Sequence, residues 1–434
     1  MFLFVVQCNK GCASTLKDGM KNVNFSPLLL LLLLMAVVPD AEGQRVRFGK
    51  YFSGRTLRLD CLREGSSRGD TVWALRWVDR RSDWHGSRKQ LIDPFPNGDY
   101  RVEMRDERSG KAIYSRAYGS LFREYCDTPA GRKGVKERFE ETLLLPMPKR
   151  AVVVALQKRG ADGRMKDATL LHFDPESTPI EHDFFVGERV DLEVHGEPSQ
   201  KVDVVIVAQG YDGGADPRLR VDYYRIKEIL FGKEPFASHR SDFNVYGVVG
   251  DVGAEYNTFG IDRYLMTPFV HRLHSRIGTT PCDFIIVMVN DTVYGGGAIY
   301  NLYAVTSMHP MAEYVLPHEF GHHFGGLADE YVDTALSYGS LHQGDMEPFE
   351  PNITNLKDFA SKWKSMLPSG TPVPTPANSA VPRSENGPLG VYEGAGYAAK
   401  GIYRPTMHCM MRDYAPFCPV CKKRLEEVFG LYTK

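Results

Sequence analysis

Residues 318–331 have the sequence HEFGHHFGGLADEY, and this stretch decides how the rest of the chain is interpreted. On a helix, His318 and His322 lie one turn apart on the same face, so both imidazoles can reach a single metal ion. Glu319 then lies beside the water on that metal rather than on the metal itself. A Zn²⁺ ion lowers the pKa of its bound water to about 7, and a neighbouring carboxylate can take the proton. We therefore predict a Zn²⁺ site with His318 and His322 as ligands and Glu319 as the general base.

A catalytic zinc site usually takes a third protein ligand and keeps one position open. Gly325 and Gly326 can end the helix in a left-handed turn that sends the chain back toward the metal. Such a turn would bring Asp329 to the zinc, whereas on an unbroken helix it would lie about 16 Å along the axis from His318. Asp329 is therefore the predicted third ligand, and Glu330 is the alternative.

Two neighbours of the motif have other expected roles. His323 faces about 100° away from His322 on the helix, so we expect it to pack against the core or to support the ligands. Pro317 removes a backbone donor and bends a helix that runs through it. We therefore expect the active helix to begin near Val315.

Methionines gather near the C-terminus, in the sequence RPTMHCMMRD at residues 404–413. Methionine is flexible and polarizable, and such side chains can form an apolar floor beneath metal ligands. Because it follows a His-Glu-x-x-His helix, the segment resembles the Met-turn of metzincins, with Met411 as the assigned methionine.

The sequence from Gln44 to Pro198 predicts antiparallel β-structure. Polar and apolar residues alternate there, as on strands that bury one face. The alternating runs are residues 45–48, 56–59 and 100–104. Turn signals at Ser109-Gly110 and at residues 161–163 separate such strands. We expect an accessory β-sandwich over residues 44–198, with one short helix near residues 133–139 and no catalytic group.

The pattern changes after a linker at residues 196–199. Continuous apolar runs now alternate with amphipathic stretches, as in a mostly parallel sheet with helices on its faces. The expected strands are residues 202–208, 243–249 and 284–289, and the expected helices are residues 219–231 and 261–277. We expect a three-layer α/β domain over residues 199–434, with a loop-rich part at residues 338–397 that contains one short helix at residues 356–366.

The N-terminus has the pattern of a secretory signal. A basic flank precedes an apolar run at residues 28–38, and small residues follow it, so cleavage before Gln44 is expected. The run is shorter than the roughly 20 residues that span a bilayer, which favours a signal over a membrane anchor. We expect residues 1–43 to be a signal region, with Met20 as an alternative start. The mature protein would then be secreted, periplasmic or on the cell surface, with no stable membrane span.

Charge and cysteine content narrow the class further. The chain has 53 Lys and Arg against 54 Asp and Glu, a balance that argues against a nucleic-acid binder. Six cysteines follow Gln44, an even number that permits disulfides in an exported protein. Cys418 and Cys421 form a C-x-x-C pair, which is used either as half of a zinc site or as a redox motif. Because no second such pair exists, we expect structural disulfides, with Cys409 as one partner.

Several segments together resemble the IgA-peptidase family of bacterial zinc metallo-endopeptidases. They are the His318–His322 motif, Leu327-x-Asp329-Glu330-Tyr331, residues 294–301, Cys409-x-Met411-Arg412 and residues 417–421. The resemblance is strong from residue 202 to the C-terminus and looser over the β-rich part. It implies an N-terminal antiparallel β-sandwich followed by a metzincin-like three-layer zinc-peptidase domain.

The leading functional hypothesis is an endopeptidase that binds one Zn²⁺ ion and cuts a protein or peptide substrate held along residues 298–303. Tyr331, Tyr294 and Tyr414 are alternatives for stabilising the oxyanion. A second hypothesis is a zinc hydrolase of another amide, at a peptide terminus or in cell-wall peptide. A third is an inactive metalloprotease-like binding protein. Under each of the three hypotheses, the N-terminal domain could contact glycan or protein.

Overall fold

The computed structural model describes residues 46–182, 188–333 and 346–433. The described residues belong to one compact unit that begins at Val46. The signal region expected at residues 1–43 lies outside them. Within the described ranges, no helix has the length and apolar character needed to cross a membrane.

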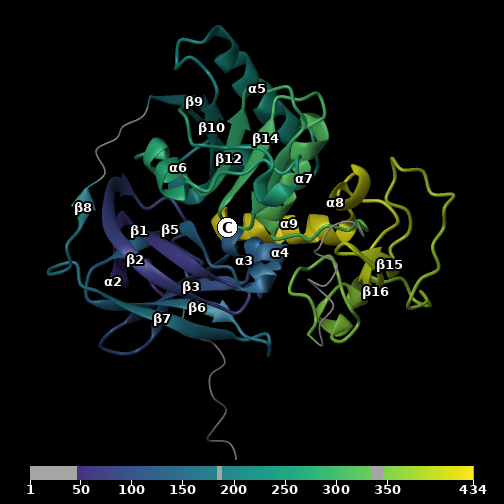
Figure 1. Cartoon of the computed structure of the whole chain (residues 1–434), viewed down its shortest axis with the longest axis horizontal. Helices are drawn as coiled ribbons and strands as arrows, with labels where there is room; N and C mark the ends of the chain where they lie inside the picture. Colours follow the sequence, from purple (N-terminus) through teal and green to yellow (C-terminus); the bar gives the residue numbers. More distant parts are fainter. Residues whose placement is uncertain (1–45, 183–187, 334–345, 434) are drawn as a thin grey trace, which may run out of the picture. The chain divides into compact units, whose positions relative to one another are not determined.

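The N-terminal region forms two four-stranded sheets (Figure 1). The first has the order β5-β1-β2-β8 and the second the order β4-β3-β6-β7. The strands are β1 (Phe52–Ser66), β2 (Gly69–Asp83), β3 (Tyr100–Asp106), β4 (Ala112–Tyr118), β5 (Glu137–Pro148), β6 (Val152–Arg159), β7 (Met165–Phe173) and β8 (Glu181–His182). Leu59 of β1, Val102 of β3 and Val154 of β6 are buried in one shared core. The predicted N-terminal β domain is therefore present.

Local details of the N-terminal prediction are wrong. The strand expected at residues 45–48 is replaced by the short helix α2 (Phe48–Tyr51), and the helix expected near residues 133–139 lies earlier in the chain. It consists of α3 (Leu121–Asp127) and α4 (Pro129–Lys133), followed directly by β5. Gly134 explains the difference, because it ends α4 in a left-handed conformation with φ 89°.

The second half of the chain is built on a six-stranded sheet with the order β13-β14-β12-β10-β11-β9. Its strands are β9 (Arg189–Glu193), β10 (Val202–Gln209), β11 (Phe243–Val249), β12 (Phe284–Val289), β13 (Gly296–Ile299) and β14 (Tyr303–Ser307). The four central strands run parallel, and both edge strands are antiparallel to their neighbours. Strands β10, β11 and β12 coincide with the three continuous apolar runs of the sequence. The edge strand β9 precedes the expected linker at residues 196–199 and already pairs with β11.

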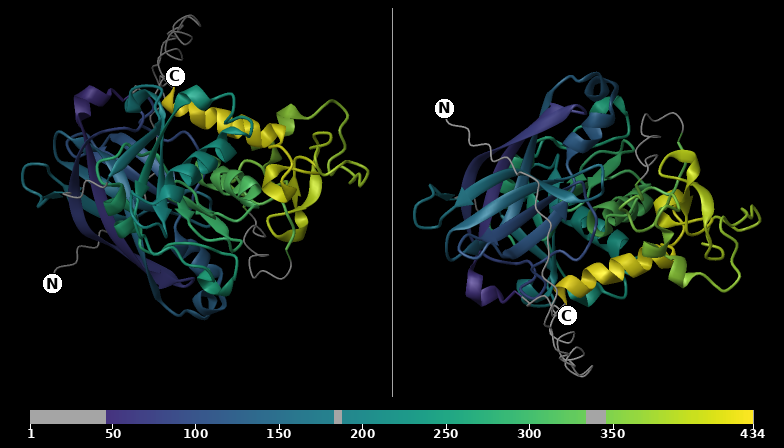
Figure 2. Two further views of the ribbon diagram at one scale, coloured as in Figure 1. Left: turned by 90° about the horizontal axis from the view of Figure 1, so that it is seen from above. Right: turned by 90° about the horizontal axis from the view of Figure 1, so that it is seen from below.

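Helices cover both faces of this sheet. Alternate residues of β10, such as Val204 and Ile206, share a core with α5 (Pro217–Phe231), α7 (Ala312–Gly325) and α9 (Pro419–Tyr432). Val205 and Val207 point to the other face and share a core with α6 (Val270–Ile277) and with the N-terminal strands. Figure 2 shows α9 extending from the neighbourhood of the hairpin formed by β15 (Tyr392–Ala395) and β16 (Ala398–Arg404) to the C-terminus.

Helix α6 is shorter than the stretch 261–277 that the sequence predicts. Residues before it form irregular backbone, with an isolated bridge between Glu255 and Met266. Pro268 accounts for the late start, because the residue before a proline is disfavoured in the helical region.

The N-terminal strands pack directly against the second half of the chain. Arg58 Nη2 of β1 donates to the carbonyl of His271 at 2.8 Å, and His271 Nε2 donates to the carbonyl of Cys61 at 3.0 Å. Arg58 is buried, so this contact lies inside the protein. The β domain is thus joined to the six-stranded sheet through α6.

The C-terminal part contains little regular structure besides α9. It holds the hairpin of β15 (Tyr392–Ala395) and β16 (Ala398–Arg404), the short helix α8 (Met410–Asp413), and the 3-10 turns Phe359–Ser361 and Lys364–Met366. The two turns take the place of the helix expected at residues 356–366. Further 3-10 turns are Pro198–Gln200, Arg240–Asp242 and Thr258–Gly260.

The expectation of disulfides is wrong for the cysteines that the structure describes. All six, Cys61, Cys126, Cys282, Cys409, Cys418 and Cys421, are buried free thiols. The Sγ atoms of Cys409 and Cys421 are 3.7 Å apart. A disulfide bond is only about 2.05 Å long.

Candidate metal centre

The His-Glu-x-x-His motif lies on α7, which runs unbroken from Ala312 to Gly325. The helix therefore begins earlier than the predicted start near Val315, and Pro317 lies inside it. Val315 N–H already bonds to the carbonyl of Met311 at 3.0 Å. Pro317 costs the helix the one hydrogen bond that its missing N–H would have made, and the turns on either side continue.

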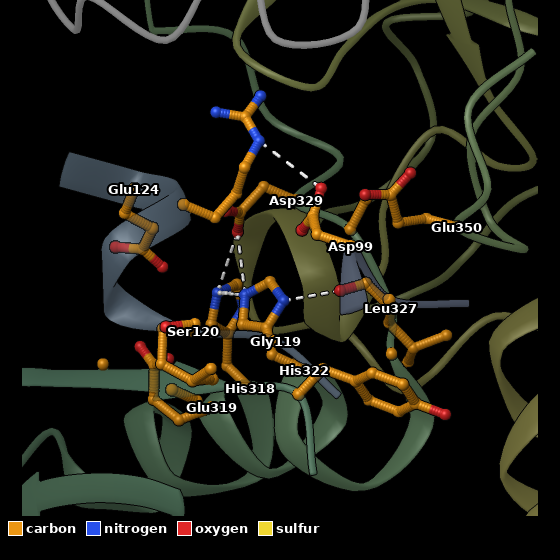
Figure 3. A pocket seen from close by; sticks show the side chains of 18 of the residues that line it. Asp99, Gly119, Ser120, Glu124, His318, Glu319, His322, Leu327, Asp329 and Glu350 are labelled. Atoms are coloured by element: carbon orange, nitrogen blue, oxygen red, sulfur yellow. Dashed lines mark hydrogen bonds and ion pairs between the residues drawn. The ribbon is translucent and has the colours of Figure 1, made fainter. Parts of the chain in front are cut away.

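The side chains of His318, His322 and Asp329 converge on one point (Figure 3). The two Nε2 atoms are 3.2 Å apart, and Asp329 Oδ1 lies 3.0 Å from His318 Nε2 and 3.3 Å from His322 Nε2. Such a set of two imidazole nitrogens and one carboxylate oxygen is a common ligand set for Zn²⁺. The structure thus brings together the three residues predicted as ligands.

Backbone carbonyls orient both imidazoles. His318 Nδ1 donates to Met410 O at 2.9 Å, and His322 Nδ1 donates to Leu327 O at 2.6 Å. Because a carbonyl only accepts, each Nδ1 carries a proton, and Nε2 is left as the nitrogen of each ring that can bind the metal. The donor set therefore fits a divalent cation.

The turn after α7 is what returns Asp329 to the histidines. Gly326 has φ 60° and ψ 36°, the left-handed conformation that glycine adopts most easily. A Cβ atom at this position would lie 2.6 Å from Asn97 Nδ2 and 3.0 Å from the Tyr300 ring. Asn97 Nδ2 also donates to Gly326 O at 3.0 Å, and Arg424 Nε donates to Gly325 O at 2.9 Å. Both side chains are buried, so the turn is held from two sides.

Electrostatics make the centre a binding place for a cation. Burial raises the pKa of Asp329, but the charges of His322 and His318 outweigh it and hold the pKa well below its usual range. Burial likewise opposes protonation of His322, yet the Asp329 carboxylate raises its pKa to about 9. Tyr397 OH donates to Asp329 Oδ2. The carboxylate is thus a buried anion whose other oxygen faces the imidazoles.

Glu330, the alternative third ligand, points elsewhere. Its carboxylate accepts from Asn352 Nδ2 at 2.9 Å and lies 3.3 Å from Cys421 Sγ. It belongs to a second group of ligand-type side chains, separate from the histidine pair.

The remaining predicted neighbours occupy supporting positions. His323 is buried, accepts from Ile285 N at 3.1 Å and donates to Ile299 O at 3.1 Å. Burial lowers its pKa to about 3, so it is a neutral core residue, as expected. Met411 is fully buried, and its sulfur would lie 2.8 Å from a Cβ added to Gly321. The methionine therefore packs directly beneath the motif.

The centre opens into a cavity of about 240 Å³. Glu319 and the three predicted ligands line it together with Asp99 and Glu124 of the N-terminal domain (Figure 3). Arg123 of the same domain and strand β13 line it as well. Burial raises the pKa of Glu124 to about 7. The sequence predicted no site residue in this domain, because the alternation of its strands carries no sign of the cavity.

Other polar residues near Glu319 were also missed by sequence reasoning. Arg263 lines the same cavity, and Tyr397 contacts the predicted ligand Asp329. Both come from irregular segments without a motif. The three predicted tyrosines lie close together: Tyr294 OH is 3.1 Å from Tyr414 OH, and both line a small cleft with Tyr331, His318 and Glu319.

Comparison with known families agrees with this arrangement. The model of the family described as IgA Peptidase M64 matches residues 190–251, 248–387 and 379–429, more than half of the chain. The model of the Peptidase M64 N-terminus matches residues 47–169. No curated protein matches the chain. The two family models cover both the N-terminal β domain and the part with the candidate metal centre, and the chain therefore belongs to the IgA peptidase M64 family.

Proposed function

We propose that this protein is a secreted zinc-dependent endopeptidase with a metzincin-like catalytic domain. The observation that carries the proposal is the convergence of His318, His322 and Asp329 beside Glu319 in one cavity. Membership of a peptidase family supports hydrolysis of peptide bonds in a protein substrate. Secretion is supported by the signal-like sequence before Gln44 alone.

The chain's own residues prepare the attack of water on a peptide carbonyl. When bound, a Zn²⁺ ion supplies a Lewis acid that polarises the carbonyl and makes water more acidic. Glu319 takes the proton of the attacking water and returns it to the leaving amine. Burial raises the pKa of Glu319 despite the opposing charges of His318 and His322, and a raised pKa makes the carboxylate a stronger base toward the attacking water.

The negative charge that develops on the carbonyl oxygen needs a donor. Arg263 lies close enough to Tyr331, Tyr294 and Asp329 to interact with them, and it lines the cavity with Glu319. We add Arg263 to the three tyrosines as a candidate for stabilising the oxyanion.

Strand β13 is the proposed platform for the substrate backbone. It is an edge strand of the six-stranded sheet and lines the cavity beside Glu319. Gly296 already pairs with residues 263–265 through an isolated bridge, so the proposed platform is the remaining part of the strand, residues 297–299. An extended peptide can pair with such an edge through backbone hydrogen bonds. The platform is narrower than the sequence predicted, because Tyr303 begins the interior strand β14 and is fully buried.

The test compares the purified wild type with Glu319→Ala on a mixed-protein substrate, with and without a zinc chelator. We expect cleavage at internal bonds that the chelator and the substitution both abolish, while Glu319→Ala keeps its zinc. Glu313→Ala is a matched control, since Glu313 lies on the same helix but is exposed. Cleavage that survives Glu319→Ala would refute the proposed base, and products trimmed only at their ends would point to an exopeptidase.

A further inference from the structure

Three cysteines and a glutamate form a second buried cluster, consisting of Cys409, Cys418, Cys421 and Glu330. One ligand atom from each residue lies within 4.8 Å of the others, and all four residues have 0 % exposed surface. The cluster joins three separate segments: the chain after α7, the start of α8 and the N-terminus of α9.

We propose that this cluster is a structural zinc site, a second metal centre distinct from the one at His318. Four protein ligands leave no open position, which is the pattern of structural rather than catalytic zinc. Cysteine thiolates select zinc over hard cations such as Ca²⁺ and Mg²⁺.

Distances within the cluster match the edges of a zinc tetrahedron. With Zn–S bonds of about 2.3 Å, two sulfurs on one zinc lie about 3.8 Å apart, and a sulfur and a carboxylate oxygen lie about 3.5 Å apart. The observed separation is 3.7 Å between the Sγ atoms of Cys409 and Cys421, and 3.3 Å between Cys421 Sγ and Glu330 Oε1. These two edges therefore already have the spacing that the metal requires, and all four ligand atoms lie within 4.8 Å of one another.

Glu330 is difficult to explain without a cation. Its Oε2 atom is buried and has no hydrogen-bond partner among the residues that the structure describes. A buried carboxylate oxygen without a partner costs free energy, which a metal ligand bond would offset.

Neighbouring hydrogen-bond donors and positive charges would stabilise thiolates in the cluster. Backbone N–H groups point at two of the sulfurs, from Cys418 to Cys409 Sγ at 3.3 Å and from Cys421 to Cys418 Sγ at 3.5 Å. Arg412 Nη1 donates to Glu330 O at 3.1 Å, and the buried Arg404 interacts with the Glu330 carboxylate. Three thiolates and one carboxylate around Zn²⁺ leave a charge of about −2, and the buried guanidinium group of Arg404 offsets part of it.

A redox role of the C-x-x-C pair fits the structure less well than a structural zinc site. Reactive cysteines of that type are partly exposed so that another thiol can reach them. Cys418 and Cys421 are fully buried, which leaves no path for thiol exchange.

Metal content of the full-length protein, loaded with Zn²⁺, tests the proposal. We expect two zinc ions per wild-type chain and one in the double variant Cys418→Ser/Cys421→Ser. The double variant His318→Ala/His322→Ala should also keep one. Cys126→Ser is the matched control, because it removes a buried thiol outside the cluster and should keep both ions. The same zinc content in the cysteine variant as in the wild type would overturn the proposal. One zinc in the wild type that survives loss of both histidines would contradict the proposed function instead.

Cobalt provides a second measurement that does not depend on the cysteine variant being folded. The His318→Ala/His322→Ala variant is loaded with Co²⁺, and its near-ultraviolet spectrum is recorded. We expect the charge-transfer absorption of thiolate bound to cobalt, since the remaining site carries three cysteines. A bound cobalt ion without that absorption would refute thiolate ligation. A Cys409–Cys421 disulfide, detected by mass spectrometry in protein prepared without reductant, would also refute it.

Discussion

Replacing Gly326 with alanine perturbs the turn that returns the chain from α7 to the metal centre. The residue has φ 60°, where a Cβ atom costs roughly 1–2 kcal/mol. The added carbon would also lie 2.6 Å from Asn97 Nδ2, and overpacking of this kind costs typically 1–3 kcal/mol. Together the two effects predict a loss of about 2–5 kcal/mol in the free energy of unfolding.

Gly110→Ala is the matched control for this substitution. Gly110 has φ 66° and nothing within 4 Å of an added Cβ, so only the backbone effect of about 1–2 kcal/mol is expected. Denaturant unfolding measures both variants. Competition with a chelator measures their affinity for zinc, which should fall at least tenfold in Gly326→Ala because relief of the clash moves Asp329. Equal destabilisation of the two variants, together with unchanged zinc affinity in Gly326→Ala, would refute the role of the turn.

Three further perturbations address the centre itself. Tyr397→Phe removes the hydrogen bond to Asp329 Oδ2. Chelator competition should then show zinc affinity reduced by roughly 10–100-fold. An unchanged affinity would contradict the role of Tyr397 in orienting Asp329. His322 has its pKa raised to about 9 in the metal-free protein, so it is protonated below that pH and zinc must displace its proton. Apparent zinc affinity should therefore fall as pH drops below about 9 and level off above it. Calorimetry at pH 7 in buffers of different ionisation enthalpy should detect the release of a proton when zinc binds. Absence of proton release would refute the raised pKa of His322. Gly321→Ala places a Cβ 2.8 Å from Met411 Sδ and should lower the free energy of unfolding by roughly 1–3 kcal/mol in denaturant unfolding. Adding Met411→Val should restore part of this loss. An equal loss with and without Met411→Val would contradict the contact.

Sequence patterns predicted those parts of the molecule that depend on neighbours along the chain. The apolar run at residues 202–208 specifies a strand buried on both faces, and β10 is such a strand. The turn at Gly326 follows from the freedom of glycine, and with it the approach of Asp329 to the histidines. Each inference needs only a few consecutive residues and one geometric rule.

Features that depend on distant partners were not predictable in this way. Arg263 and Glu124 reach the cavity only because the six-stranded sheet and the N-terminal domain pack together. We expected Cys421 to form a disulfide because the chain has no second C-x-x-C pair that could complete a zinc site with four thiolates. Its carboxylate neighbour Glu330 lies 91 residues earlier in the chain. The pairing of a cysteine motif with a single carboxylate from another segment has no local signature.

The consecutive residues Asp329 and Glu330 point into different ligand clusters, and this explains why sequence alone left the choice between them open. The segment that carries Met410 and Met411 connects the two clusters. Met410 O accepts the proton of His318 Nδ1 at 2.9 Å, and Met411 O accepts from Glu330 N at 2.7 Å. A metal held by the cysteine cluster would therefore restrain the carbonyl that orients the His318 imidazole. It would also restrain the segment that carries Asp329. Ligand orientation of this kind sets metal affinity, so the proposed structural zinc would influence the proposed catalytic centre although none of its four ligands has a proposed role in the reaction.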